Sequence, residues 1–166
     1  VMPRAYIDLN RGSDELDPAV ISGIISRSKN NRISHGLGVI PRVVGNGKEI
    51  YKGKISQAEA EIRILNYWRP YHLVLKKLMT ETHKKFGTAI LIDCHSMPTL
   101  PNYSGPKQLQ KMPDIILGDR FGGSADRDIV DKIESIFVRE GFSVGRNVPF
   151  SGAFITKEYG LPSSNR

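Results

Sequence analysis

Apolar residues occur along this chain in two patterns, short β-favouring runs and longer stretches with helical spacing. The clearest short runs are rich in Ile and Leu and do not alternate with polar residues, which is typical of parallel strands covered on both faces. Runs of this kind predict strands at 88–94 and 114–119, and β-favouring stretches predict further strands at 5–9 and 142–147.

Helical spacing is clearest between residues 56 and 87. Ser56 followed by Glu59 forms a capping box, in which the serine accepts from first-turn amides and the glutamate reaches back to the cap amide. Pro70 lacks an amide donor, so it predicts a stop or a kink. A second helix is expected over 71–85, with Gly87 as its stop.

Two further helices are predicted on either side of this region. One is a short helix over 19–30, weakened by Gly23, and the other begins at Ser124 as its N-cap and ends at Gly141. Between the first two helical regions, Asn46 and Gly47 are typical of a hairpin turn.

Helices that alternate with buried strands favour one class of fold. The order of elements predicts an α/β domain, a three-layer sandwich with a mostly parallel or mixed central sheet. We expect a single domain over 1–166. A strand pattern close to the first residue and the lack of a closing element before the last one predict that the fold continues beyond both ends.

Composition narrows the possible functions. The 166 residues carry a net charge of +7, which suits anionic ligands. The basic residues are scattered without interleaved aromatic residues, which argues against nucleic-acid binding. One cysteine fits a reducing compartment, and no apolar run approaches a membrane span or a signal peptide, so we expect a cytoplasmic protein.

Polar side chains follow the predicted strands where each strand ends. Because ligands of open α/β sheets bind beyond the carboxyl ends of the strands, we expect these groups to share one edge. Each group also has a structural interpretation: Asp8 could cap a turn, Arg11 could be a surface cation, and His95 could be a core histidine. Cys94 is expected to be a small buried residue rather than a nucleophile. The polar groups are Asp8, Asn10 and Arg11, then Asp93, His95 and Ser96, then Arg146 and Asn147.

Five motifs taken together are more specific than any of these groups. In order they are "YIDLNR", "YWRPYH", "DCHSMP", "ILGDRFG" and "NVPFSGAFITKEYG". This series resembles the N-formylglutamate amidohydrolase (deformylase) family over residues 4 to 162, and its shorter elements resemble the wider group of zinc carboxypeptidases and aspartoacylases. The resemblance implies a zinc-carboxypeptidase-like fold and a metal-dependent amidohydrolase that cleaves the formyl or other acyl amide of an acidic amino acid.

The resemblance also implies roles for individual residues. It makes His95 a ligand of zinc or another divalent metal, and Asn10 and Arg11 the pair that binds the substrate carboxylate. Arg146, Asn147 and Tyr159 are further substrate contacts. Asp93 is not expected to orient His95, because residues two apart on a strand lie roughly 6–7 Å from each other.

A catalytic zinc usually has three protein ligands and a water molecule, whereas this sequence offers one good candidate. The resemblance places the general-base glutamate after the "KEYG" segment, outside the chain, so no catalytic residue is assigned. Two alternatives therefore stand beside the enzyme: a member that only binds carboxylated ligands, and a related zinc carboxypeptidase or aminoacylase. In each case we expect a small anionic ligand derived from an amino acid, and neither nucleic acid nor membrane as a partner.

Overall fold

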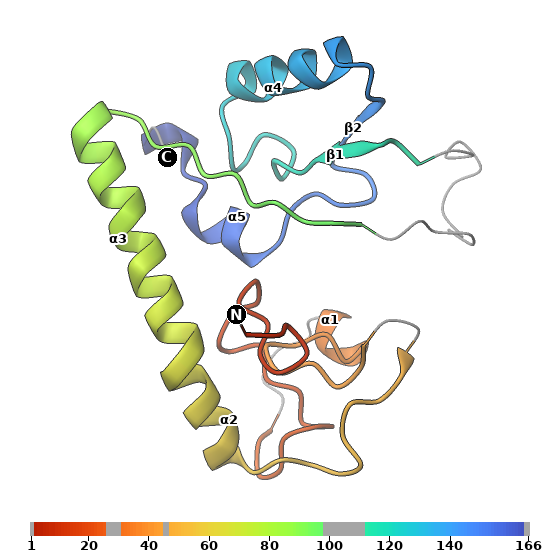
Figure 1. The fold of residues 1–166 in the computed structure, drawn as a ribbon. Helices are drawn as coiled ribbons and strands as arrows, with labels where there is room; N and C mark the ends of the chain where they lie inside the picture. The colour runs from red at the N-terminus through yellow and green to blue at the C-terminus, as the bar shows by residue number, and fades with distance from the viewer. Residues whose placement is uncertain (1, 26–30, 45–46, 98–111, 165–166) are drawn as a thin grey trace. The chain divides into compact units, whose positions relative to one another are not determined.

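The computed structural model describes residues 2–25, 31–44, 47–97 and 112–164. The chain divides into two compact units, Val1–Thr80 and Glu81–Arg166, which are considered separately. The described residues form a mixed α/β protein with a small parallel sheet (Figure 1). None of their helices combines the length and the apolar composition that crossing a membrane requires.

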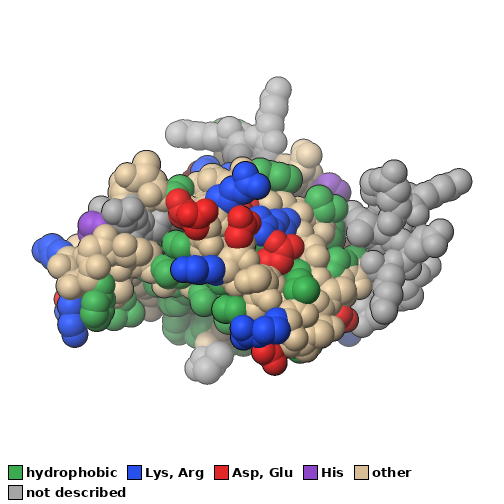
Figure 2. Space-filling model, turned by 90° about the horizontal axis from the view of Figure 1, so that it is seen from above, with side chains coloured by type: hydrophobic (Ala, Val, Ile, Leu, Met, Phe, Trp, Pro, Cys, Tyr) green, Lys and Arg blue, Asp and Glu red, His purple; other side chains and the backbone are tan. Residues whose placement is uncertain are grey.

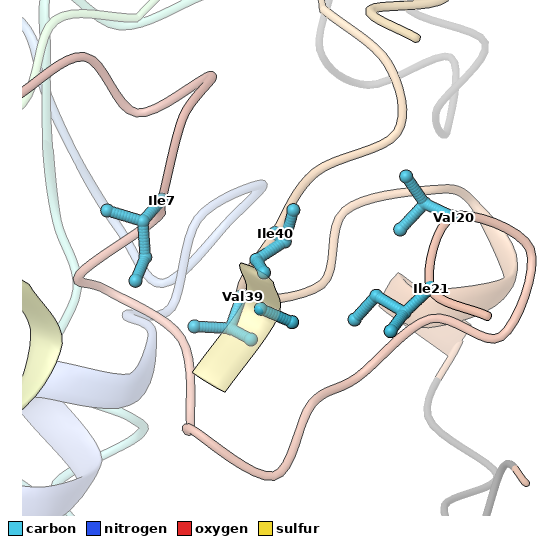
Figure 3. Packing of buried hydrophobic residues seen from close by; sticks show 6 residues of the cluster. Ile7, Val20, Ile21, Val39 and Ile40 are labelled. Atoms are coloured by element: carbon cyan, nitrogen blue, oxygen red, sulfur yellow. The ribbon is translucent and has the colours of Figure 1, made fainter. Parts of the chain in front are cut away.

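The first unit is built from turns around a small apolar core. Its fully buried side chains come from three separate stretches of the chain (Figure 3). A parallel bridge, Ile21 to Ile55, connects the early turns to the segment before the helix α2, Gln57–Arg63. The core residues are Ile7, Val20, Ile21, Val39, Ile40 and Ala60.

The predicted strand at 5–9 is wrong, because this segment is a turn. The amide of Tyr6 donates to the carbonyl of Pro3 at 2.9 Å, and the amide of Asp8 donates to the carbonyl of Val39 at 2.7 Å. Ile7 is buried as the pattern indicated, yet the backbone forms turns and a single bond to the distant Val39 instead of a ladder.

The helix predicted over 19–30 is also absent from its described part, residues 19–25. The side chain of Asp17 accepts from the amide of Ala19 at 2.8 Å, which closes an Asx turn in place of a helical turn. Gly23 then takes a left-handed conformation. The sequence pattern gave no sign of the short helix α1, Asn31–Ser34.

The hairpin expected around Asn46 and Gly47 is supported by the residues on either side. Val43 and Glu49 form an antiparallel bridge, and the amide of Val44 donates to the carbonyl of Lys48 at 2.9 Å. Asn46 itself lies outside the described residues.

One continuous helical stretch follows, composed of α2 (Gln57–Arg63), the π-helix η2 (Ile64–Trp68) and α3 (Arg69–Phe86). Ser56 is the N-cap and accepts from the amide of Glu59 at 3.1 Å, as predicted. The Glu59 carboxylate accepts from Arg63 at 2.8 Å, so the helix start differs from the expected reciprocal box.

Pro70 neither stops nor visibly breaks this helical stretch. Immediately before it the helix widens, and the Arg69 amide donates to the carbonyl of Ile64, five residues back. A π-turn is a known way for a helix to absorb a local disruption of its hydrogen-bond ladder. Gly87 ends the helix as expected, with a φ of 72° and its amide 2.8 Å from the carbonyl of His83.

The second unit contains the parallel sheet. Strand β1, Ile115–Leu117, pairs in parallel with β2, Val144–Arg146, and the helix α4, Arg127–Arg139, connects them and packs on both (Figure 1). Both strands and the helix were predicted. The N-cap is Asp126 rather than Ser124, because the Asp126 carboxylate accepts from the amide of Asp128.

The predicted strand at 88–94 is not assigned as a strand in the described part of the chain. Ile90 and Ile92 are 56% and 67% exposed, so this segment is not the buried strand that its composition indicated. Cys94 is exposed as well, contrary to the expectation. Apolar composition favours an extended backbone, whereas burial and pairing need neighbours that composition does not specify.

The remaining elements of the second unit are short. Helix α5, Phe154–Tyr159, follows the β2 loop, and the 3₁₀-helix η3, Pro162–Ser164, comes after it. On the face that carries α4, acidic and basic side chains are intermixed (Figure 2).

Candidate functional site

The "DLNR" turn of the first unit is organised around the buried carboxylate of Asp8. This carboxylate accepts from the amide of Asn10 at 3.0 Å and from Arg4 through two bonds, of 3.2 and 2.8 Å. Arg11 Nη2 lies 3.9 Å away. Asp8 therefore does cap a turn, as its structural interpretation stated, and the same turn presents Asn10 and Arg11.

Arg11 is not a surface cation. Its side chain is 12% exposed, Nε donates to the carbonyl of Leu37 at 2.9 Å, and Nη1 donates to the carbonyl of Asn10 at 2.7 Å. Burial lowers the pKa of Arg11, and nearby Asp8 opposes that change. Because a guanidinium loses its proton only far above neutral pH, Arg11 remains positively charged.

In the second unit, Asn147 organises the loop after β1. Its side-chain oxygen accepts from the amides of Asp119 and Phe121 at 3.1 and 3.2 Å, and its amide group donates to the carboxylate of Asp119 at 2.6 Å. The residue is buried and takes a φ of 61°. Asn147 therefore joins the carboxyl ends of the two strands.

The loop held by Asn147 presents Arg120. Arg120 and Phe121 both have left-handed backbones, with φ of 56° and 58°. The Arg120 amide donates to the carbonyl of Ser151 at 2.8 Å. Strained backbone of this kind occurs mainly where surrounding contacts impose it, often at functional sites. In the part of the chain that the structure describes, no carboxylate forms an ion pair with the Arg120 guanidinium.

Two glycines let the later motif approach this loop. A Cβ on Gly118 would lie 2.8 Å from the amide nitrogen of Gly152, and a Cβ on Gly160 would lie 2.4 Å from the carbonyl of Ser124. Three motifs, "ILGDRFG", "GRN" and "PFSGAF", therefore meet at the carboxyl ends of β1 and β2. Tyr159, the last residue of α5, is half-buried beside Gly160.

Arg146 is directed differently from the expectation that it binds substrate. Its guanidinium pairs with Asp131 at 2.6 Å and with Glu134, both on α4. These hydrogen bonds, that of Asp131 first, raise the pKa of Arg146. This cation is thus already neutralised by two carboxylates.

His95 lies close to Asp93, contrary to the expectation. Nε2 of His95 is 2.9 Å from the Asp93 carboxylate, and the imidazole is 44% exposed. The segment is not held flat in a sheet, so the two side chains lean together across the distance between their backbones. Because the imidazole is exposed, His95 is not a core histidine. Metal-ligating histidines are commonly oriented by a hydrogen bond to a carboxylate, as His95 is placed to be by Asp93.

A zinc ion fits this pair in part. The Asp93–His95 arrangement suits one ligand with its supporting carboxylate, whereas no group of three or more His, Cys, Asp or Glu side chains suitable for a metal forms within residues 2–25, 31–44, 47–97 and 112–164. His95 and Arg11 belong to different units, so their expected meeting across one opening stays a prediction.

The sequence interpretation missed Trp68, His72 and Arg120 as parts of these sites. Trp68 and His72 contact the backbone beside Asn10, and Arg120 is presented by the Asn147 loop. All three lie in motifs quoted above, "YWRPYH" and "ILGDRFG", which are the only signal that could have found them.

These features define a mixed α/β protein, and comparison with known proteins narrows the class. The chain matches the family described as N-formylglutamate amidohydrolase over residues 1–166. It is 30% identical over 167 residues to the N-formylglutamate deformylases of Pseudomonas aeruginosa and Pseudomonas putida. These alignments cover 98% of this chain and 56% of each relative, so the chain spans a little over half of their length.

A solved structure agrees with this match. The crystal structure of N-formylglutamate amidohydrolase from Ralstonia eutropha JMP134 has a TM-score of 0.87 at 31% identity, covering 99% of this chain and 60% of that one. The chain therefore belongs to the N-formylglutamate amidohydrolase family.

Proposed function

We propose that the protein containing this chain hydrolyses the formamide of N-formyl-L-glutamate. In this reaction a water oxygen bonds to the formyl carbon, the carbon–nitrogen bond breaks, and formate and glutamate are released. The family match over residues 1–166 carries the proposal. The finer fold in this proposal is a single three-layer domain with a zinc-carboxypeptidase-like sheet.

Asn10 and Arg11 bind one carboxylate of the substrate in this proposal. A guanidinium offers paired donors that match a carboxylate, and the frame around Asp8 fixes their direction before the ligand arrives. Preformed donors of this kind lose little entropy on binding.

The second unit supplies further contacts with the substrate. Arg120 is the stronger candidate for a second carboxylate, because Arg146 would first have to leave Asp131 and Glu134. Asn147 acts through the loop that it holds, and Tyr159 remains a proposed contact from α5.

His95 is the proposed ligand of zinc or another divalent metal, oriented by Asp93. A bound zinc supplies a water of lowered pKa and polarises the carbonyl that is attacked. The residues of this chain contribute the orientation of the imidazole and the binding of the anionic substrate.

Formate release tests this proposal. The protein that contains this chain, supplied with zinc, is expected to release formate from N-formyl-L-glutamate and no acetate from N-acetyl-L-glutamate. Release of acetate at an equal rate would favour a broader zinc aminoacylase. His95→Ala should abolish turnover, whereas Thr80→Val, a change on α3 outside the proposed contacts, should not.

A second candidate is a member that binds carboxylated ligands without hydrolysing them. The lack of a group of three metal-ligating side chains in the described residues favours it. Binding of N-formyl-L-glutamate by calorimetry without release of formate would support this candidate against the enzyme.

A further inference from the structure

The motif "YWRPYH" has no role in the proposed function, yet two of its side chains contact the "DLNR" turn. The indole Nε1 of Trp68 donates to the carbonyl of Arg11 at 2.8 Å. Nε2 of His72 lies 2.9 Å from the carbonyl of Leu9, and because a carbonyl only accepts, this nitrogen carries the proton. The two bonds lie on either side of Asn10.

The side chains of Trp68 and His72 pack against each other. They are four residues apart and therefore share one face of the helical stretch. Their rings lie 4.0 Å apart between centroids, tilted by 36°. His72 is buried, and Trp68 packs against the core cluster around Ile7. The positions of both donors are thus fixed by packing as well as by the helix.

These bonds affect where the Arg11 guanidinium lies. Nη1 of Arg11 donates to the carbonyl of Asn10. This carbonyl lies in the chain between those of Leu9 and Arg11, which accept from His72 and Trp68. Rotation of its peptide would move the acceptor that holds the guanidinium. The bonds from Trp68 and His72 oppose such movement, because they hold the carbonyls of the two neighbouring peptides, and the His72 side chain is buried.

We infer that Trp68 and His72 are positioning residues for the carboxylate-binding pair Asn10 and Arg11. They act on the backbone of the turn, so that its amide and guanidinium groups face one carboxylate of the ligand. This inference rests on the proposed function, in which that carboxylate belongs to N-formyl-L-glutamate.

The only tryptophan of the sequence reports on this place directly. The purified chain, labelled with ¹⁵N, is titrated with N-formyl-L-glutamate while the single indole N–H resonance is followed. Binding at Arg11 is expected to shift this resonance, because its acceptor belongs to Arg11. Arg11→Ala should abolish both the shift and the binding measured by calorimetry.

Two substitutions separate the hydrogen bonds from the packing. Trp68→Phe keeps an aromatic ring and removes the donor, and His72→Leu removes the other donor. Each should weaken binding roughly three- to tenfold, the range expected for one lost hydrogen bond. His72→Gln keeps a donor near the position of Nε2 and should restore most of the affinity.

Thr80→Val provides the matched control. It removes a hydroxyl that donates to the carbonyl of Lys76 on the same helix, away from the turn, and should leave affinity unchanged. Circular dichroism and melting temperature follow folding in every variant.

Each outcome decides the question. If Trp68→Phe and His72→Leu lower the melting temperature but bind like the parent, both residues are structural and the inference is wrong, while the proposed function stands. If the parent chain itself binds no N-formyl-L-glutamate, the proposed binding at Arg11 fails together with the inference. The inference is supported if Trp68→Phe and His72→Leu both bind more weakly and His72→Gln binds nearly as well as the parent.

Discussion

At the scale of single residues, the arginines differ in what their guanidinium groups contact. Arg146 is neutralised by two carboxylates of α4, and Arg11 is fixed by two backbone carbonyls. Arg120 is presented on a strained loop without a carboxylate partner in the described ranges. All three residues are arginines, and their surroundings decide which of them can bind an anion.

Arg120→Ala is expected to weaken binding of N-formyl-L-glutamate by about tenfold or more, since a hydrogen bond to a charged group contributes about 1.5–3 kcal/mol. Arg146→Ala, its control, should change affinity by less than about twofold, because this side chain is held by α4. Calorimetric titration measures both. A larger loss in Arg146→Ala would return the substrate contact to Arg146.

Asn147→Asp tests the hydrogen bonds by which Asn147 holds the loop after β1. The change keeps an oxygen for the amides of Asp119 and Phe121 but places a second carboxylate beside that of Asp119. We expect the unfolding free energy to fall by about 1–3 kcal/mol at pH 7. Because repulsion raises the pKa of such a pair, the loss should shrink as pH falls toward about 4.

Urea unfolding of Asn147→Asp and of the parent chain at both pH values measures this difference. Asn147→Ala is the control, since it removes all three bonds without adding charge and its loss should not shrink at low pH. An equal loss at both pH values in Asn147→Asp would contradict the role assigned to the amide group.

At the scale of elements, local sequence signals predicted both ends of the long helical stretch, whereas two of the four predicted strands are not assigned in the described residues. Ser56 and Gly87 bound the long helical stretch as expected, because a cap bond and a left-handed turn are local events. The prediction for Pro70 was wrong, since the ladder widened into η2 and continued. Tertiary contacts of Trp68 and His72 on either side favour that continuation.

Ser56→Ala should lower the unfolding free energy by about 1 kcal/mol, because the amide of Glu59 loses its acceptor. Ser56→Asp keeps an acceptor and should restore most of that stability. Thermal unfolding by circular dichroism gives both values. If Ser56→Ala unfolds at the parent temperature, the cap does not stabilise this helix.

At the scale of the whole molecule, the net charge of +7 favours anionic ligands without choosing among them. The affinity for N-formyl-L-glutamate should fall between 50 and 500 mM salt, because screening weakens attraction for a dianion. N-formyl-L-glutamine, with one charge fewer, should show a shallower dependence. Equal dependence for both ligands would argue against two cationic contacts.

The sequence predicted the second unit better than the first. The β1–α4–β2 order follows from an apolar run and a β-favouring stretch separated by an amphipathic helix, an order with few alternative topologies. In the first unit, apolar residues such as Ile7 and Val20 are buried by turns, which periodicity does not detect. The run at 88–94 has the composition of a strand but is not assigned as one, because strand pairing depends on partners elsewhere.

The motifs by themselves determined the family, the candidate residues and the ends of the long helix. Only the tertiary structure decided that Arg11 is fixed by backbone carbonyls, that Asp93 reaches His95, that Arg146 is held by α4, and that Trp68 and His72 bracket Asn10. The reason is physical: a motif records which groups are present, whereas the partner of a charge or a hydrogen-bond donor is set by residues distant in sequence and near in space.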